Sequence, residues 1–316
     1  MRIPALLLTL AMFSLSISSG RTQTPGGIRA DSLEEDFAGE SGPSLFAQSA
    51  SQTLNRDFPG ADISFLLLDA KTGVVLASRW DHPETPIPMG SLVKPFVALA
   101  YGELHEFKYP THICRGTATG CWRPRGHGPV DLTSAIAYSC NSYFRLLTTN
   151  MTAAEVSPTA DRFGLQPPAP EIAGAALAGL GAHAESASAG TGNHDSDNQW
   201  LITPMNMAGA YLELIRSRDQ PGVRLLLTGM ELAARQGTGA EVGRALPHSR
   251  ALVKTGTAPC THTRHAPGDG FTVALLPADA PKILLLVRVH GVPGAQAART
   301  AGQMLRRIDP TAEAGH

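Results

Sequence analysis

Runs of β-forming residues lie near both ends of this chain, and the long stretch between them has helical patterns. Residues 63–68 and 74–78 are the first pair, joined by a five-residue turn that makes a hairpin. Residues 251–257, 270–276 and 282–290 carry three further strand patterns. Because strands need partners, we expect one sheet that is assembled from both ends of the chain, with helices packed on it.

The region between the two groups of strands is predicted to be mostly helical. Pro95 lies in the first turn of the helix that Ser91 begins, where a missing N–H group costs little. Thr203 and Pro204 are a typical helix start, because threonine caps free N–H groups and proline is tolerated at the first position. The predicted helices cover residues 44–54, 91–101, 132–151 with a break near Ser139, 153–163, 205–216, 223–236 and 295–308.

The composition is that of a globular domain. Of the 316 residues, 43% are hydrophobic and 17% are charged, which is enough apolar material for a sizeable core. The formal net charge is -1, and lysine and arginine are scattered along the chain, so nothing favours a nucleic-acid partner.

The N-terminus has the pattern of an export signal. Arg2 supplies a positive charge, residues 3–17 are an almost unbroken apolar run, and residues 18–20 are small, as a signal peptidase requires. The alternative is an uncleaved anchor, because residues 3–20 are just long enough to cross a bilayer. We therefore expect an exported protein, in the periplasm or at the extracytoplasmic face of the membrane, with N-terminal membrane association if the anchor is retained.

The chain has four cysteines, at positions 114, 121, 140 and 260. In an oxidising compartment Cys114 and Cys121 can close a small disulfide loop, and the alternative is that all four thiols are reduced or buried. Cys260, His262 and His265 are metal-ligand types at short spacing, but one such group on a predicted loop is more often a polar loop. We therefore predict no metal site and no cofactor.

Three short motifs can carry chemistry. The first is Ser91-Leu92-Val93-Lys94, in which serine and lysine lie on the same face of a helix. A serine hydroxyl needs a base to become a nucleophile, and lysine acts as that base when burial and nearby positive charge lower its pKa. Such a pair occurs by chance on many solvated helices, so it is a weak signal when taken alone.

The second motif is Ser139-Cys140-Asn141. The serine can relay a proton, and the asparagine can hold a substrate amide through its donor and its acceptor. The same residue types also make ordinary helix breaks through local side-chain hydrogen bonds.

The third motif is Lys254-Thr255-Gly256-Thr257, at the end of a strand pattern. The lysine adds positive charge, the glycine allows a substrate backbone to approach, and the hydroxyls can bind a carboxylate. The N–H groups of Thr257 and Ser91 can form an oxyanion hole. The alternative is a strand that simply ends in a turn.

The order and spacing of these motifs resemble those of penicillin-binding proteins and serine β-lactamases, whose signature is S-x-x-K, then S-x-N, then K-T-G. The segment Met89-Gly-Ser-Leu-Val-Lys-Pro-Phe96 is similar to the "PGS-x-x-K-P-F" segment of penicillin-binding transpeptidases. Leu201–Ala208 is similar to their "T-P-L-Q-M-A" helix start, and Lys254–Ala258 to their "K-T-G-T-A" strand. The resemblance covers roughly residues 60 to 307.

The resemblance implies both a fold and a domain plan. The fold class is α+β: a five-stranded antiparallel sheet flanked by helices, plus an all-helical lobe, with the active site between them. The domain plan has three segments: a signal peptide or anchor at residues 1–20, a polar linker at 21–48, and a penicillin-binding transpeptidase-like catalytic domain at 49–316.

The resemblance also implies a reaction. Ser91 attacks the carbonyl before the terminal D-alanine of a peptidoglycan stem peptide and forms an acyl-enzyme. Lys94 is the base, and Ser139 passes the proton to the leaving amine. Asn141 and residues 254–257 bind the substrate, no cofactor takes part, and β-lactams acylate the same serine.

Three fates of that acyl-enzyme stay open. A D,D-transpeptidase passes it to another stem peptide and a D,D-carboxypeptidase passes it to water, both in cell-wall peptidoglycan biosynthesis. A β-lactamase of the class D kind would carry a carbamate on Lys94, and a sensor would bind or acylate and then stop. Glu155, Glu171 and Glu185 are candidate deacylation bases only by elimination. The acyl acceptor and the oligomeric state are not predicted.

Overall fold

The computed structural model describes residues 44–180, 199–260 and 268–308, which belong to a unit spanning Pro43–His316. The predicted signal or anchor at residues 1–20, most of the predicted linker, and His262 and His265 lie outside the described residues. Among the helices that the structure describes, none combines the length and the apolar character needed to cross a bilayer.

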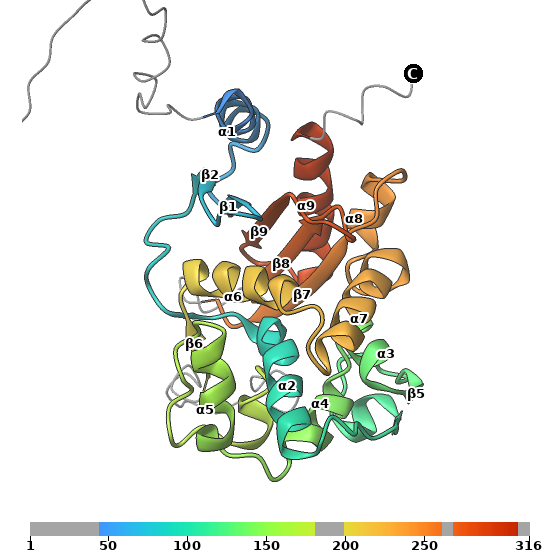
Figure 1. Cartoon of the computed structure of the whole chain (residues 1–316). Coiled ribbons are helices and arrows are strands. Elements are labelled where there is room, and N and C mark those ends of the chain that lie inside the picture. Colours follow the sequence, from blue (N-terminus) through green and yellow to red (C-terminus); the bar gives the residue numbers. More distant parts are fainter. Residues whose placement is uncertain (1–43, 181–198, 261–267, 309–316) are drawn as a thin grey trace, which may run out of the picture. The chain divides into compact units, whose positions relative to one another are not determined.

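A five-stranded antiparallel sheet stands at the centre of the described chain (Figure 1). Its strands, in the order β2-β1-β9-β8-β7, are Val75–Arg79, Ile63–Asp69, Ile283–Val289, Asp269–Leu276 and Leu252–Ala258. β1 pairs with β9 over its whole length, from Ile63 opposite Val289 to Asp69 opposite Ile283. This pairing joins the two ends of the domain, as the positions of the strand patterns predicted.

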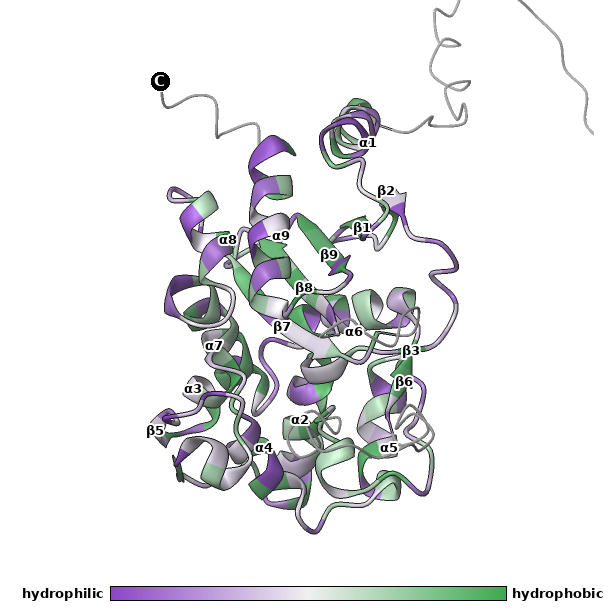
Figure 2. Cartoon of the chain, turned by 180° about the vertical axis from the view of Figure 1, so that it is seen from behind, coloured by the Kyte–Doolittle hydropathy of each residue, from purple (hydrophilic) through white to green (hydrophobic). Residues whose placement is uncertain are grey.

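The two faces of the sheet enter two different hydrophobic cores. In β1, Phe65 and Leu67 pack in the core that contains residues of α1 (Leu45–Asp57) and α9 (Gly294–Ile308). Leu66 and Leu68 belong to the other core, which the helical lobe shares. A strand that is buried on both faces has no polar side to alternate with, so it reads as a continuous apolar run. Figure 2 shows this hydrophobic character in the strands between the helices.

The helices divide between the sheet and a separate lobe. α6 (Pro204–Arg216) packs on the face of the sheet opposite to α1 and α9, while α7 (Val223–Gln236) and α8 (Ala240–Ala245) lie near the edge strand β7. The lobe contains α2 (Lys94–Leu104), α3 (Leu132–Ala137), α4 (Asn141–Thr148) and α5 (Ala153–Arg162). The predicted α+β fold, with its flanked antiparallel sheet and helical lobe, is therefore confirmed.

Short elements complete the lobe. Two small antiparallel pairs are β3 (Ile87–Pro88) with β6 (Leu201–Ile202), and β4 (His112–Cys114) with β5 (Gly128–Val130). Three 3₁₀ turns cover Gly90–Val93, Gly116–Thr119 and Gly174–Ala176. The β4–β5 pair and the turn at Gly90–Val93 border the site described below.

Local signals set several helix ends. The hydroxyl oxygen of Thr203 accepts a hydrogen bond from the N–H group of Asn206 at 3.0 Å, so the predicted cap of α6 is confirmed. Ser44 caps α1 in the same way, through the N–H group of Ala47 at 3.2 Å. α1 therefore begins at Leu45, which corrects the predicted linker boundary at residue 48. Ser91 lies in a 3₁₀ turn before α2, and not in the α-helix itself.

Candidate active site

The three predicted motifs meet at one cleft, between the edge strand β7 and the helical lobe. The cleft has a volume of about 310 Å³. Its lining residues are Ser91, Trp122, Ser139, Asn141, Gly179, Leu180, Thr238, Thr255, Gly256, Thr257, Gly294 and Ala295. The two lysines of the motifs, Lys94 and Lys254, lie beneath this surface and are fully buried.

The turn that carries Ser91 packs directly against β7, and glycines make the contact possible. A Cβ atom added to Gly256 would lie 2.5 Å from the carbonyl oxygen of Met89, which is closer than atoms can approach. Gly90 has a φ of +54°, and a Cβ atom there would overlap the carbonyl group of Thr257. The close packing brings the backbones of Ser91 and Thr257 to the same cleft.

Lys94 connects the nucleophile turn to the Ser139 turn. Its Nζ atom donates to the backbone oxygen of Ser139 at 3.0 Å, to the Ser139 hydroxyl at 3.3 Å and to Oδ1 of Asn141 at 2.8 Å. Burial lowers the pKa of Lys94 to about 7, because a charged amine loses its hydration there; negative charge at Cys140 and Cys121 opposes part of this shift. Lys94 can therefore hold or release a proton near neutral pH.

Lys254 reaches the same serine from the sheet. Its Nζ atom donates to the Ser139 hydroxyl at 3.0 Å and to the backbone oxygen of Thr255 at 2.6 Å. Burial lowers the pKa of Lys254 well below its ordinary value, and the charge of Lys94 lowers it further. The Ser139 hydroxyl therefore bridges two lysines whose positive charges oppose each other.

The Ser139 turn has an unusual backbone. Ser139 has a φ of +50°, in the left-handed region that costs a residue with a Cβ atom roughly 1–3 kcal/mol. The turn is held from outside: Nε1 of Trp122 donates to the backbone oxygens of Tyr138 and Ser139, both at 3.2 Å. The N–H group of Cys140 also donates to the carbonyl of Ala135 at 2.9 Å. The conformation that presents Ser139 and Asn141 thus depends on tertiary contacts.

The remaining predicted residues are anchored to their neighbours. The hydroxyl of Thr257 accepts a hydrogen bond from the N–H group of Gly294 at 3.0 Å. The hydroxyl of Thr255 donates to that of Thr238 at 2.6 Å. Within the described residues the Ser91 hydroxyl makes no hydrogen bond, and Lys94 is directed at the Ser139 turn instead. Catalytic hydrogen bonds of this kind often tighten only when substrate binds.

The structure brings together all eight predicted catalytic and substrate-binding residues, but it does not join the two cysteines. Cys114 and Cys121 are free thiols, so the predicted disulfide loop is not formed. Their sulfur atoms converge instead on His127. We did not predict Trp122 or Thr238 at the cleft, because each is an isolated residue on a connecting segment with no motif around it.

A second cavity of about 370 Å³ adjoins the cleft and shares Trp122, Thr238 and Ala295 with it. It is lined further by residues of the α7–α8 region and of the start of α9, including Arg244 and Arg299. The pair of cavities offers more room than a single side chain needs, and it is partly basic.

The chain is similar to known proteins in sequence and in fold. Residues 63–308 match the family described as "Penicillin binding protein transpeptidase domain". The sequence matches no curated protein.

Among solved structures, the D,D-transpeptidase domain of a peptidoglycan glycosyltransferase from Eggerthella lenta is 15% identical, with a TM-score of 0.62, over 83% of this chain and 82% of that one. Pseudomonas aeruginosa PBP2, solved with the compound WCK 5153, is 18% identical, with a TM-score of 0.62, over 83% and 73% of the two chains. Helicobacter pylori PBP2, solved with MreC, is 17% identical, with a TM-score of 0.64, over 82% and 62%. At these identities the likeness concerns the fold.

Proposed function

The chain belongs to the penicillin-binding protein transpeptidase domain family, and on this basis we propose that it is a serine acyltransferase that acts on D-Ala-D-Ala stem peptides through a Ser91 acyl-enzyme. The observation that carries the proposal is the convergence of a cleft serine, two buried lysines and a relay serine at one point. A buried lysine with a pKa near 7 is the base that a serine nucleophile needs.

The proposed acylation moves one proton along a short path. Neutral Lys94 takes the proton of Ser91 as Oγ attacks the carbonyl carbon before the terminal D-alanine. The oxyanion accepts hydrogen bonds from the N–H groups of Ser91 and Thr257. As the C–N bond breaks, Lys94 returns the proton through the Ser139 hydroxyl, 3.3 Å away, to the nitrogen of the leaving D-alanine. The products are an ester on Ser91 and free D-alanine.

Substrate binding uses the remaining motif residues. In the proposal, Asn141 holds an amide of the acyl donor, and the hydroxyls of Thr255 and Thr257 face its terminal carboxylate. Lys254 adds positive charge next to that carboxylate and to Ser139. The adjoining cavity of about 370 Å³ gives a stem peptide room to extend beyond the reacting bond.

The surroundings of the ester favour transfer to an amine over rapid hydrolysis. None of the described residues that line the cleft is a carboxylate, so no general base stands beside the ester to activate water. Glu155 caps α5 through Thr152 on the surface, Glu171 is exposed, and Glu185 lies outside the described residues. We therefore favour D,D-transpeptidase activity, with D,D-carboxypeptidase activity as the variant in which water is the acceptor.

The environment of Lys94 also argues against a carbamate. Three oxygen acceptors already surround its Nζ atom, at 2.8, 3.0 and 3.3 Å. They favour the N–H donors of an amine, whereas a carbamate would bring oxygen atoms against them. This arrangement supports the transpeptidase proposal over a β-lactamase of the class D kind.

Labelling with a fluorescent penicillin tests the proposal. The protein should form a covalent adduct, and Ser91→Ala should abolish it. Ser157→Ala, which removes a hydroxyl that bonds only the backbone of its own helix, should label normally. Intact labelling of Ser91→Ala would remove the central claim.

The lifetime of the adduct then separates the alternatives. We expect hours, as for a penicillin-binding protein, whereas seconds would indicate a β-lactamase. Release of D-alanine from a stem pentapeptide separates an enzyme from a sensor. Incorporation of an added amine acceptor separates a transpeptidase from a carboxypeptidase.

We also propose an extracytoplasmic location, which rests on the export pattern of residues 1–20 and on the family. The partners that fit this proposal are peptidoglycan stem peptides and β-lactams. Recovery of the protein in the cytoplasmic fraction, with residues 1–20 intact, would contradict it.

A further inference from the structure

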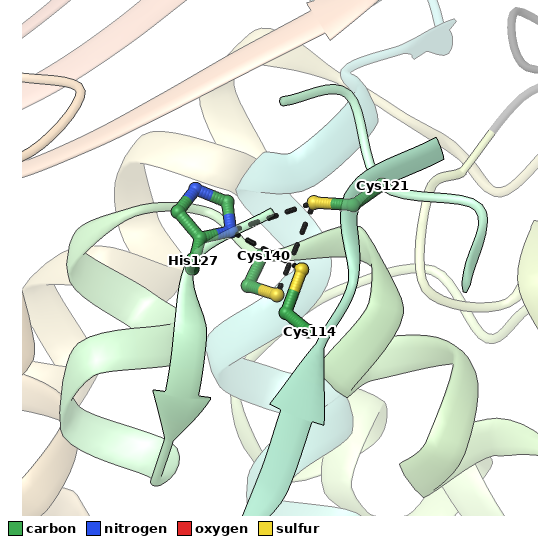
Figure 3. A group of neighbouring side chains, drawn as sticks. All are labelled: Cys114, Cys121, His127 and Cys140. Carbon is green, nitrogen blue, oxygen red and sulfur yellow. Dashed lines mark hydrogen bonds between the residues drawn. The ribbon is translucent and has the colours of Figure 1, made fainter. Parts of the chain in front are cut away.

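Beside the candidate active site, four side chains point toward one another (Figure 3): Cys114, Cys121, His127 and Cys140. Cys114 ends β4, Cys121 follows the turn at Gly116–Thr119, His127 precedes β5, and Cys140 lies between α3 and α4. Their ligand atoms all lie within 4.8 Å of one another. We call this group the Cys₃His cluster.

The distances within the cluster match a tetrahedral zinc site. Nδ1 of His127 lies 3.5 Å from Sγ of Cys114 and 3.5 Å from Sγ of Cys121, and the sulfurs of Cys121 and Cys140 are 3.9 Å apart. With ordinary zinc–sulfur and zinc–nitrogen bond lengths, the corners of a tetrahedron are about 3.6 Å apart for sulfur and nitrogen and about 3.8 Å apart for two sulfurs. One ion at the centre therefore reaches all four atoms with little movement.

The side chains in this place are hard to explain without an ion. The three cysteines are 2%, 4% and 0% exposed, and none is bonded to another. Within the described residues the polar contacts of the His127 ring are the two cysteine sulfurs at Nδ1, while its Nε2 atom is buried without a partner. Thiols are weak hydrogen-bond donors and acceptors, so they repay the burial of an imidazole poorly.

The backbone around the cluster is built to hold it. Cys114 pairs with Gly128 in the β4–β5 ladder, which fixes the ends of the loop that carries Cys121 and His127. Inside the loop, the N–H group of Cys121 donates to the carbonyl of Gly116 at 3.0 Å. Gly126 has a φ of +72°, and a Cβ atom there would overlap the carbonyl of Cys114. Three ligands are thus fixed on one compact hairpin, and Cys140 comes from outside it.

We propose that the Cys₃His cluster binds one zinc ion as a closed, four-coordinate structural site. Three thiolates and one imidazole are a typical ligand set for structural zinc, and they leave no open position for a substrate. Binding converts three thiols to thiolates and releases three protons, while His127 binds through its neutral Nδ1 atom.

The site joins two segments that shape the cleft. Cys140 stands between Ser139 and Asn141, and Cys121 precedes Trp122, whose indole donates to the Ser139 carbonyl. The ion would tie these segments together and so keep Ser139 in its left-handed conformation. This positioning role rests on the proposed function, whereas zinc binding itself does not.

Metal analysis tests the site directly. The exported chain, purified without chelator or reductant, should carry one zinc per chain. Cys114→Ser and Cys140→Ser should each lower the zinc content at least tenfold, and Cys260→Ser, a cysteine outside the cluster, should not. His127→Cys, which keeps four ligands, should retain the ion where His127→Ala loses it. A full zinc content in both Cys114→Ser and Cys140→Ser would overturn the proposal.

A second measurement does not depend on variants. Cobalt exchanged into the wild-type protein should give the intense visible absorption of a tetrahedral thiolate site, and one equivalent of zinc should abolish it. Four titratable thiols with no bound metal would overturn the proposal. A mass lower by two hydrogens, from a disulfide between Cys121 and Cys140 or between Cys114 and Cys121, would overturn it as well.

The positioning role has its own readout. In folded Cys114→Ser, the covalent step of penicillin labelling should slow about 10- to 100-fold, while the initial non-covalent affinity changes little. An unchanged covalent rate in zinc-free protein would overturn the positioning role. Because zinc is counted without any acyl chemistry, failure of the labelling assay in the wild type would remove the proposed function and leave the metal result standing.

Discussion

The cleft has two walls, each of which presents polar groups to the same serine hydroxyl, and they are held in place by different means. The sheet wall, Lys254–Thr257, is part of β7, which pairs with β8 without interruption from Leu252 opposite Leu275 to Ala258 opposite Asp269. The helical wall, Ser139–Asn141, lies between two short helices, with Ser139 at a φ of +50°. Contacts from Trp122, Lys94 and the Cys₃His cluster surround it.

This difference shows where each wall is vulnerable. A ladder of backbone hydrogen bonds keeps its geometry when one side chain changes, provided that the new side chain fits. A strained turn keeps its geometry only while its side-chain partners remain. We therefore expect the sheet wall to fail through steric overlap and the helical wall to fail through the loss of single contacts.

Removal of the amine that touches the helical wall should have the largest effect. Lys94→Met keeps a similar length and deletes the proposed base, so we expect the rate constant for penicillin acylation at pH 8 to fall about 10³-fold. The control is Lys108→Met, an exposed lysine paired with Glu106 on the surface, which should acylate normally. A loss of less than tenfold in Lys94→Met would assign the base role to another group.

An overlap in the sheet wall should come next. The Cβ atom of Gly256→Ala would lie 2.5 Å from the Met89 carbonyl oxygen, and overpacking of this kind costs about 1–3 kcal/mol. We expect the melting temperature to fall by several degrees and acylation to slow, because β7 is pushed away from the nucleophile turn. Gly209→Ala has nothing near its new methyl group and should melt at or above the wild-type temperature. Equal melting temperatures for both variants would contradict the packing described.

The pH dependence of acylation should show the state of Lys94. The neutral amine is the base, so the rate should rise as pH passes through the pKa of Lys94, about 7, and then level off. Between pH 6 and pH 8 the neutral fraction grows about tenfold. Lys254, Cys121 and Cys140 also act on this titration, so the midpoint should shift in Lys254→Met. A rate that falls over this range would contradict the proposed role.

Loss of one indole donor should give the smallest effect. Trp122→Phe keeps a ring but removes the hydrogen bonds to the Tyr138 and Ser139 carbonyls, each worth about 0.5–1.5 kcal/mol. Acylation should slow roughly two- to tenfold by the same estimate, because the Ser139 turn is held less firmly. Gln236→Ala, which loses only a bond to the Tyr138 hydroxyl, should not slow it. Equal rates in all three proteins would show that the helical wall needs no such support.

Much of the fold could be predicted because its signals are local. The apolar run at residues 63–68 became β1, the cap at Thr203 begins α6, and the predicted helix at 223–236 has the observed bounds of α7. α8 was not predicted, because six residues containing a glycine carry too weak a helical period. The three motifs converge on the cleft because each lies at an element end that the fold brings to the same place.

The cysteines mark the limit of such reasoning. Their spacing in the sequence drew Cys114 and Cys121 together as a disulfide, and His127 was considered only as a turn residue. The structure adds Cys140, which lies 19 residues beyond Cys121, and turns His127 toward the same point. Spacing along the chain cannot give distances between segments that are packed together only after folding.

By itself, the sequence determined that strands from both ends share a sheet and that a serine, two lysines and a relay serine stand in a recognisable order. Local hydrophobic pattern and motif spacing are enough for that, since they act over a few residues. Only the tertiary structure decided that Lys94 is buried with a lowered pKa, that Ser139 bridges both lysines, and that three cysteines and a histidine meet beside it. Desolvation and ligand geometry depend on atoms from distant segments, and folding alone brings those atoms together.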